Sequence, residues 1–530
     1  MATGVLSMLA LRHRSMRRRS SSSGFATVSR WQEYRSTTQN GGTHMRSAPR
    51  SGQGLTRRET LGLAAAWQAN LIGEERQMSV LRAPEAREGE IAARVRRTHF
   101  VDSHEHLVEE PARTHWQPTP LLPCNDWALL FSHYIESDLM VAGMPSEHRS
   151  ILMSPEKDTA AKWEVLEPWW PAVRNTGYGQ AVELAASTLY GIRSLNGTTV
   201  RMMAERYTAT VKPGFYRRVL RDLAGIESCQ VNSLERTFMQ SQQPALLMQD
   251  ISILNLHTPE AWQGHAQEAG IRVSSLADYH RVVDWYFATY GPYAVAVKSQ
   301  SAYSRELDFQ DVPAEAADPI FRRILNGEHP HPQERRKLED HLFWYCVRKA
   351  TEYRLPVKLH TGYYAGHNGM PLARVAGNPG HVTELLRRAP ETTFVLMHIC
   401  YPFHEQMVAL AKHWHNAVVD MCWSWIINPE AATQFLRSFL MAAPSSKILT
   451  FGGDYIPVEP VIGHAMIARH GITLALNGLV RDGWLTQSAA IDLVEPLMRG
   501  NARRIFMLDE KEKVLANAPW LHKPISSARS

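Results

Sequence analysis

Short apolar runs alternate with amphipathic helical segments from about residue 95 toward the C-terminus. Eight runs have the composition of buried strands: 99–104, 227–233, 245–254, 293–298, 355–360, 393–398, 417–421 and 447–453. Between two of them, residues 335–354 place Leu338, Leu342 and Cys346 on one face at helical spacing. Strands that alternate with helices form parallel sheets, and eight such repeats predict an α/β fold, a (β/α)8 TIM barrel over residues 95–510.

A long segment, 107–226, separates the first two predicted strands. Parts of it are predicted to be helical, notably 127–139, 159–170 and 179–190. Because it leaves the C-terminal end of the first strand, where barrel enzymes hold their active sites, we expect it to form a helical lid insertion. Residues 511–530 are expected to form a C-terminal tail.

The N-terminal region is rich in Arg, Ser, Gly and Thr and lacks apolar periodicity. Residues 1–58 carry eleven arginines and one acid, so the net charge of +6 comes from this segment and the remainder is mildly acidic. We expect residues 1–90 to be a disordered basic leader, without a nucleic-acid partner. A twin-arginine export signal at Arg57-Arg58, an organelle-targeting peptide and a true start near Met78 are the alternatives.

Five widely spaced cysteines form no Cys-x-x-Cys pair. They predict neither a disulfide framework nor a thiolate zinc site, and they fit a reducing, cytoplasmic compartment. Cys400 and Cys422 are expected to be small core residues. No run of about 18 apolar residues is present, so neither a membrane span nor a membrane partner is expected.

His104 and His106 stand two positions apart where the first predicted strand ends. Residues i and i+2 of a strand point to the same side, so both imidazoles can converge on one metal ion. The motif is short, and taken alone it is explained equally well by two ordinary histidines.

Three further strand ends carry polar side chains that suit a metal site. His360 and His398 end the fifth and sixth predicted strands, and Asp454 follows Gly452-Gly453, two glycines expected to let the backbone turn tightly. His104, His106, His360 and Asp454 are therefore predicted to hold one divalent ion, zinc by default, with Mn²⁺ or Fe²⁺ as alternatives. Asp454 is also assigned as the base for a metal-activated water, and His398 as the group that orients this water or polarises a carbonyl.

The set His104-x-His106, His360, His398 and Asp454 resembles the amidohydrolase superfamily, in particular its amidohydrolase-related (amidohydrolase 2) branch. The segments 357–363, 395–402 and 501–506 carry the same resemblance, which covers about 97–508. It implies that the first-strand histidines, His360 and Asp454 bind the metal and that His398 assists the chemistry. The helical insertion, with Ser132-His133-Tyr134, is similar to uronate isomerases of this superfamily, whereas His398 is more like its hydrolases and decarboxylases.

Three residues are candidates for binding substrate. Lys298 ends the fourth strand and could contact substrate, form an ion pair or, as in two-metal members of the family, be carboxylated as a bridge. Arg305 could hold a substrate carboxylate through a bidentate contact. Trp423, with Asp420, is expected to line the pocket floor, although Asp420 could instead orient a ligating imidazole.

These assignments predict a metal-dependent hydrolase in which activated water attacks the carbonyl of an amide, ester or lactone. A non-hydrolytic member of the superfamily, a decarboxylase or uronate-type isomerase, is the alternative. A non-catalytic binding scaffold is the third interpretation. The expected partner is a small-molecule substrate of undetermined identity, and a homodimer is the assembly common for such barrels.

Overall fold

The structure is a computed structural model that describes residues 89–521. Almost all of the predicted leader, residues 1–88, lies outside the described residues. The strands are β1 Phe100–Glu105, β2 Ile226–Val231, β3 Leu247–Gln249, β4 Ile251–Ser252, β5 Val297–Ser299, β6 Val357–His360, β7 Phe394–Met397, β8 Ala417–Asp420 and β9 Ile448–Leu449. They form two parallel sheets in the orders β1-β2-β3 and β4-β5-β6-β7-β8-β9, which confirms the α/β fold with parallel strands.

Backbone contacts connect the two sheets at both edges. β3 and β4 are two pieces of the predicted strand 245–254, interrupted at Asp250, whose N–H donates to Val231 O at 2.9 Å. At the other edge the chain after β9 pairs with β1, where Ser103 N–H donates to Phe451 O and Asp454 N–H to His104 O, each at 2.9 Å. The carboxyl ends of β1 and β9 therefore lie side by side.

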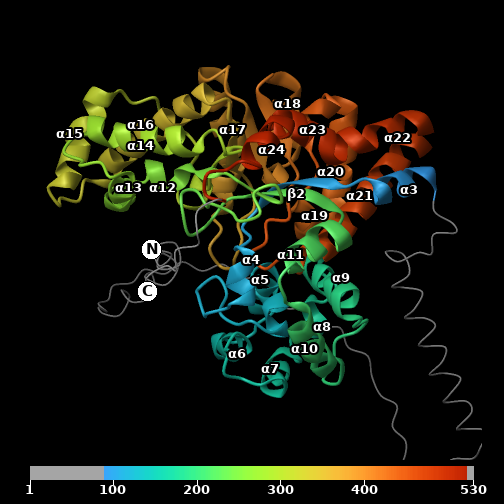
Figure 1. Cartoon of the computed structure of the whole chain (residues 1–530). Helices are drawn as coiled ribbons and strands as arrows, with labels where there is room; N and C mark the ends of the chain where they lie inside the picture. Colours follow the sequence, from blue (N-terminus) through green and yellow to red (C-terminus); the bar gives the residue numbers. More distant parts are fainter. Residues whose placement is uncertain (1–88, 522–530) are drawn as a thin grey trace, which may run out of the picture. The chain divides into compact units, whose positions relative to one another are not determined.

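Helices surround the strands (Figure 1). Those between or after strands are α12 Ile253–His257, α13 Trp262–Ala269, α14 Leu276–Tyr290, α15 Ala314–Leu325, α16 Pro332–Glu352, α17 Leu372–Arg388, α18 Glu405–His413, α19 Ser424–Ile427, α20 Pro429–Ala442, α21 Val461–Arg481, α22 Gln487–Glu495, α23 Asn501–Ile505 and α24 Leu508–Leu515. α16 shows why they form: His331 caps its first turn, Pro332 occupies N1, and Leu338, Leu342 and Cys346 are buried at helical spacing.

The segment between β1 and β2 is helical, as predicted. It contains α4 Glu110–Thr114, a 3₁₀ turn Trp127–Phe131, α5 Tyr134–Val141, α6 Ser146–Leu152, α7 Thr159–Leu166, α8 Trp170–Val173, α9 Gly177–Tyr190, α10 Thr199–Thr210, α11 Phe215–Arg217 and a π-helical turn Arg218–Leu223. Most of these helices gather on one side of the strands (Figure 1). A fully buried ion pair, Arg113 Nη2 to Glu459 Oε1 at 2.5 Å, ties α4 to the chain that follows β9.

Both ends of the described chain pack against the rest of the fold. α3 Glu90–Arg97 buries Ile91 and Val95, because it packs against α21 and α22. At the other end, Lys511 Nζ donates to Gly291 O at 3.2 Å and Trp520 Nε1 donates to Ser241 O at 2.9 Å. Residues 511–521 therefore pack on the barrel. Within residues 89–521, no helix is both long and apolar enough to cross a bilayer.

Candidate metal centre

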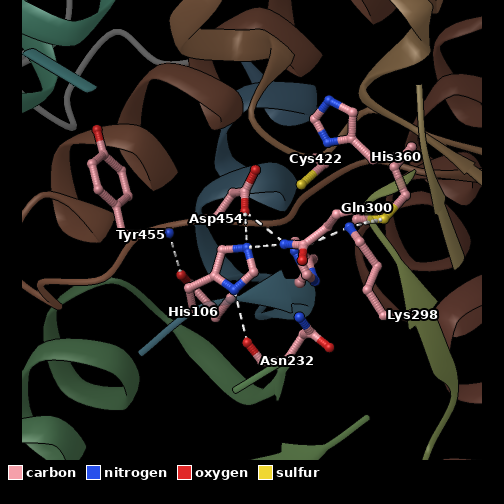
Figure 2. Close-up of polar contacts among 12 residues, drawn as sticks. His106, Asn232, Lys298, Gln300, His360, Cys422, Asp454 and Tyr455 are labelled. Atoms are coloured by element: carbon pink, nitrogen blue, oxygen red, sulfur yellow. Dashed lines mark hydrogen bonds and ion pairs between the residues drawn. The ribbon is translucent and has the colours of Figure 1, made fainter. Parts of the chain in front are cut away.

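His104, His106 and Asp454 converge where β1 meets the chain after β9. His104 Nε2 lies 3.2 Å from Asp454 Oδ1. His106 Nε2 lies 3.3 Å from the same oxygen (Figure 2). A tetrahedral ion with ligand bonds of about 2.0–2.1 Å separates its nitrogen and oxygen ligands by about 3.3–3.4 Å. The three side chains therefore already have the spacing that one coordinated divalent ion requires.

The environment of His106 fixes which ring nitrogen faces this centre. Its Nδ1 lies 2.7 Å from Asn232 O (Figure 2). A carbonyl oxygen only accepts, so Nδ1 carries the hydrogen and Nε2 presents its lone pair toward Asp454. Gln300 Nε2 lies 3.0 Å from the same His106 Nε2, a contact that sequence reasoning did not anticipate.

His398 and His360 stand beside the centre at the ends of β7 and β6. His398 Nε2 is 3.9 Å from Asp454 Oδ2, and the rings of His398 and His360 are 4.4 Å apart. His360 Nε2 lies 3.0 Å from Tyr363 O and is outside the group of ligand atoms formed by His104, His106 and Asp454. The assignment of His360 as a ligand therefore stays a prediction.

Three residues at these strand ends have left-handed backbone conformations: φ is 65° at His398, 41° at Cys422 and 60° at Asp454. Such conformations cost about 1–3 kcal/mol each in residues other than glycine, and they concentrate at functional sites. Gly452 and Gly453 were expected to supply the turn, but neither has a left-handed φ. They provide space instead, since a Cβ on Gly453 would lie 1.8 Å from Glu105 Oε1 and one on Gly452 2.8 Å from Cys422 Sγ.

Burial dominates the electrostatics of the centre. It raises the pKa of Asp454 to about 7, although the Lys298 ammonium acts in the opposite direction, and it lowers the pKa of His106 to about 3. Burial also lowers the pKa of Lys298 to about 8. Lys298 Nζ lies 3.2 Å from His104 Nε2, so an ion on this nitrogen requires the lysine to move away or lose its proton.

A buried ion pair between Lys358 and Asp250 lies among the same strands. Lys358 Nζ donates to Asp250 Oδ2 at 2.8 Å, to Asp250 Oδ1 at 3.0 Å and to Ser103 O at 2.8 Å. Ser103 Oγ donates to Asp420 Oδ2 at 2.7 Å, and this bond connects the end of β8 to β1. Sequence reasoning missed Lys358 and Asp250; the available signal was a lysine two residues before His360 in an apolar strand.

The predicted substrate-binding residues differ in their placement. Trp423 is fully buried, with its ring 5.7 Å from that of His398. Arg305 is paired with Asp340 at 2.5 Å and with Glu339 at 3.2 Å, both on α16. Its guanidinium therefore has carboxylate partners within the chain, and the contact proposed with a substrate carboxylate stays a prediction.

The helical insertion reaches the centre through α5. Tyr134 OH donates to Asp454 O at 2.7 Å, and the Tyr134 ring stacks on Trp423 at 4.1 Å. Tyr178 of α9 stacks on the Tyr134 ring at 5.3 Å. His133, beside Tyr134, is buried so that its pKa falls to about 3. The insertion thus supplies an aromatic wall next to the metal ligands.

Comparisons with known proteins agree with this architecture. Residues 295–508 match the family model described as Amidohydrolase. Protein fluG of Emericella nidulans is 25% identical over 232 residues, 42% of this chain and 26% of that protein. The match thus spans about a quarter of the length of this curated relative.

Solved structures extend the similarity over most of the chain. Uronate isomerase from Thermotoga maritima has a TM-score of 0.63 and 14% identity, covering 78% of this chain and 96% of that one. A Lactobacillus casei protein provisionally named a metal-dependent hydrolase has a TM-score of 0.56 and 15% identity, covering 80% and 99%. At these identities the structures show the fold alone. The match over residues 295–508 and this fold together support the resemblance to the amidohydrolase superfamily.

Proposed function

We propose that the chain is a metal-dependent hydrolase in which His104, His106 and Asp454 hold a divalent cation, with zinc as the first candidate. The observation that carries the proposal is the spacing of 3.2 Å and 3.3 Å around Asp454 Oδ1, in side chains that are at most 9% exposed. When bound, such an ion polarises a substrate carbonyl and lowers the pKa of a water molecule.

Asp454 is suited to act as both ligand and base because its two oxygens face different partners. Oδ1 lies against the two β1 histidines, whereas Oδ2 faces His398 at 3.9 Å. Oδ2 can therefore accept a proton from an attacking water and return it to the leaving group. Within residues 89–521 neither ring nitrogen of His398 has a hydrogen-bond partner, so this imidazole is available to orient the water or the substrate carbonyl.

We propose that the insertion acts as a lid over these groups. Tyr134 and Trp423 form one stacked wall, and Tyr303 lies against His360 with ring centroids 4.5 Å apart. Aromatic walls with few polar groups suit a compact substrate whose carbonyl is its main polar handle. We therefore propose small amides, esters and lactones as the substrate class, with Lys298 placed for a neighbouring negative charge.

A uronate-type isomerase is the second candidate. It is favoured by the helical insertion, whose Tyr134 contacts Asp454, and by the TM-score of 0.63 with the Thermotoga maritima uronate isomerase. The same centre could hold a hydroxy-carbonyl unit. Hydrolysis consumes water and releases a carboxylate, isomerisation leaves the composition unchanged, and decarboxylation releases carbon dioxide. Product analysis therefore distinguishes these reactions.

Metal content and turnover test the proposal together. We expect the purified full chain to hold at least one divalent ion, to lose it in His104→Ala, and to keep it in the control His413→Ala, an exposed histidine at the end of α18. Both variants and wild type would be assayed on lactones, amides, esters and uronates. A wild-type chain that stays metal-free after reconstitution, or full turnover in His104→Ala, would contradict the proposal.

A further inference from the structure

A cavity of about 800 Å³ lies at the amino ends of β6, β7, β8 and β9, away from the candidate metal centre. Leu355 and Pro356 line it just before β6, Thr393 just before β7 and Lys447 just before β9. His360, at the carboxyl end of β6, comes five residues after Leu355, about 16 Å along an extended strand. The cavity therefore lies on the face of the barrel that the proposed reaction does not use.

We infer that this cavity binds a small organic anion, with phosphate or carboxylate groups on an apolar body. Against one carboxylate, that of Glu391, the wall carries four cationic side chains: Arg354, Lys412, Lys447 and Arg504. His413 and His415 line it as well. Lys412 belongs to α18 and Arg504 to α23, two helices on the side of the strands opposite most of the insertion (Figure 1). Charge of one sign gathered in a concave site raises the local concentration of anions.

Three of these four cations have no ion-pair partner within residues 89–521. They donate to backbone carbonyl oxygens instead: Lys447 Nζ to Ala411 O at 2.6 Å, Lys412 Nζ to Ala442 O at 2.8 Å and Arg504 Nη2 to Ser446 O at 2.6 Å. By contrast, the neighbouring Arg503, which does not line the cavity, pairs with Glu227 at 2.6 Å. Arg354 lies 3.9 Å from Glu510. A carbonyl oxygen has no net charge, so the positive charge of the cavity is left for a ligand to balance.

Lys447 is the least exposed of the four cations, and its side chain is half-buried. Burial lowers the pKa of Lys447 below its ordinary value. Two of its three N–H groups can donate to Ala411 O and Trp414 O, which leaves one for an anion. A phosphate or carboxylate in contact with this ammonium would stabilise its charged form and raise the pKa again.

The size and the apolar lining of the cavity indicate an organic ligand. Pockets for small molecules measure about 300–1,000 Å³, and a free phosphate ion would fill only a small part of 800 Å³. Apolar side chains form part of the wall: Leu355, Pro356, Val418 and Ile505. A ring or a short chain would cover these side chains while its anionic groups contact Lys447 and Arg504.

Calorimetric titration of the full chain with phenyl phosphate tests this inference, with isophthalate as a dicarboxylate and benzyl alcohol as a neutral counterpart. We expect saturable binding of phenyl phosphate and none of benzyl alcohol. Binding of isophthalate as well would show that the site takes either anionic group, and its absence would restrict the site to phosphates. Lys447→Gln and Arg504→Gln should each weaken binding at least about tenfold, because each removes a charge-assisted hydrogen bond. The control Lys157→Gln, which removes an exposed lysine of the insertion, should bind as the wild type does.

His104→Ala separates this cavity from the metal centre, where a metal ion could also attract a phosphate. We expect His104→Ala to keep the binding that Lys447→Gln and Arg504→Gln weaken. Loss of binding in His104→Ala would place the anion at the metal centre and overturn the inference. Equal binding of benzyl alcohol, no saturable binding of either anion, or unchanged affinity in both cavity variants would overturn it too. Arg504 has an exposed side chain, so Arg504→Gln keeps the test decisive if Lys447→Gln fails to fold.

Discussion

Removing the buried ammonium of Lys358 should destabilise the barrel far more than removing a surface charge. Both Lys358 and Asp250 have fully buried side chains, and the ammonium donates to both Asp250 oxygens and to Ser103 O. Lys358→Met keeps most of the aliphatic stem but leaves Asp250 as an unpaired buried carboxylate. Breaking a buried ion pair from one side costs about 3–5 kcal/mol of unfolding free energy.

The double variant Lys358→Met/Asp250→Asn tests the reason for this cost. It removes both charges without a large change in volume, so we expect it to lose only about 1–2 kcal/mol, the cost of a few unmade hydrogen bonds. Urea unfolding followed by tryptophan fluorescence at pH 7 gives the free energies of unfolding of the wild type, the single variant and the double variant. A loss below about 1 kcal/mol in Lys358→Met, or a double variant less stable than that single variant, would refute the reasoning.

Three further perturbations probe separate features. Burial lowers the pKa of His265 from 6.5 to about 4. The unfolded chain therefore takes up a proton at this residue more readily than the folded chain below pH 6.5, and the free energy of unfolding should decrease by about 2 kcal/mol on going down to pH 5. His265→Gln should flatten that loss in urea melts across pH, whereas His329→Gln, at an exposed position, should not. Gly453→Ala should cost about 1–3 kcal/mol and lower metal content, because its Cβ would lie 1.8 Å from Glu105 Oε1, while Gly380→Ala, with open space around it, should cost nothing. Tyr134→Phe should lose about 0.5–1.5 kcal/mol in thermal unfolding but keep its metal by elemental analysis, since its hydroxyl donates to the backbone oxygen of Asp454.

The features that depend on local periodicity could be predicted from the sequence. The two-residue spacing of His104 and His106 follows from strand geometry, and the helical insertion follows from its apolar pattern. Asp454 was identified because it follows a short apolar run, and the structure places it with both histidines. Each of these patterns involves residues that are close together in the sequence, so it can be recognised before the fold is known.

Other features depend on partners far apart in the chain. Arg305 looked free because its partners, Glu339 and Asp340, lie on a helix that begins 27 residues later. The pairing of Lys358 with Asp250 depends on which strands become neighbours inside the barrel. The bond from Trp520 Nε1 to Ser241 O also joins segments far apart in the sequence, and such packing leaves no periodic signal.

The charge balance of the barrel interior supports the proposed metal centre. Two lysines, Lys298 and Lys358, are buried near the strand ends. Five carboxyl groups are buried among them: Asp102, Glu105, Asp250, Asp420 and Asp454. Burial raises the pKa of Asp102 and of Asp454 to about 7, so each binds a proton near neutral pH far more readily than an exposed aspartate does. Divalent ions supply positive charge without a proton, and they reverse this tendency in the carboxylates they touch. A surplus of buried acids over buried lysines therefore suits a site that holds a cation, whereas a scaffold stabilised by packing alone would gain nothing from burying it.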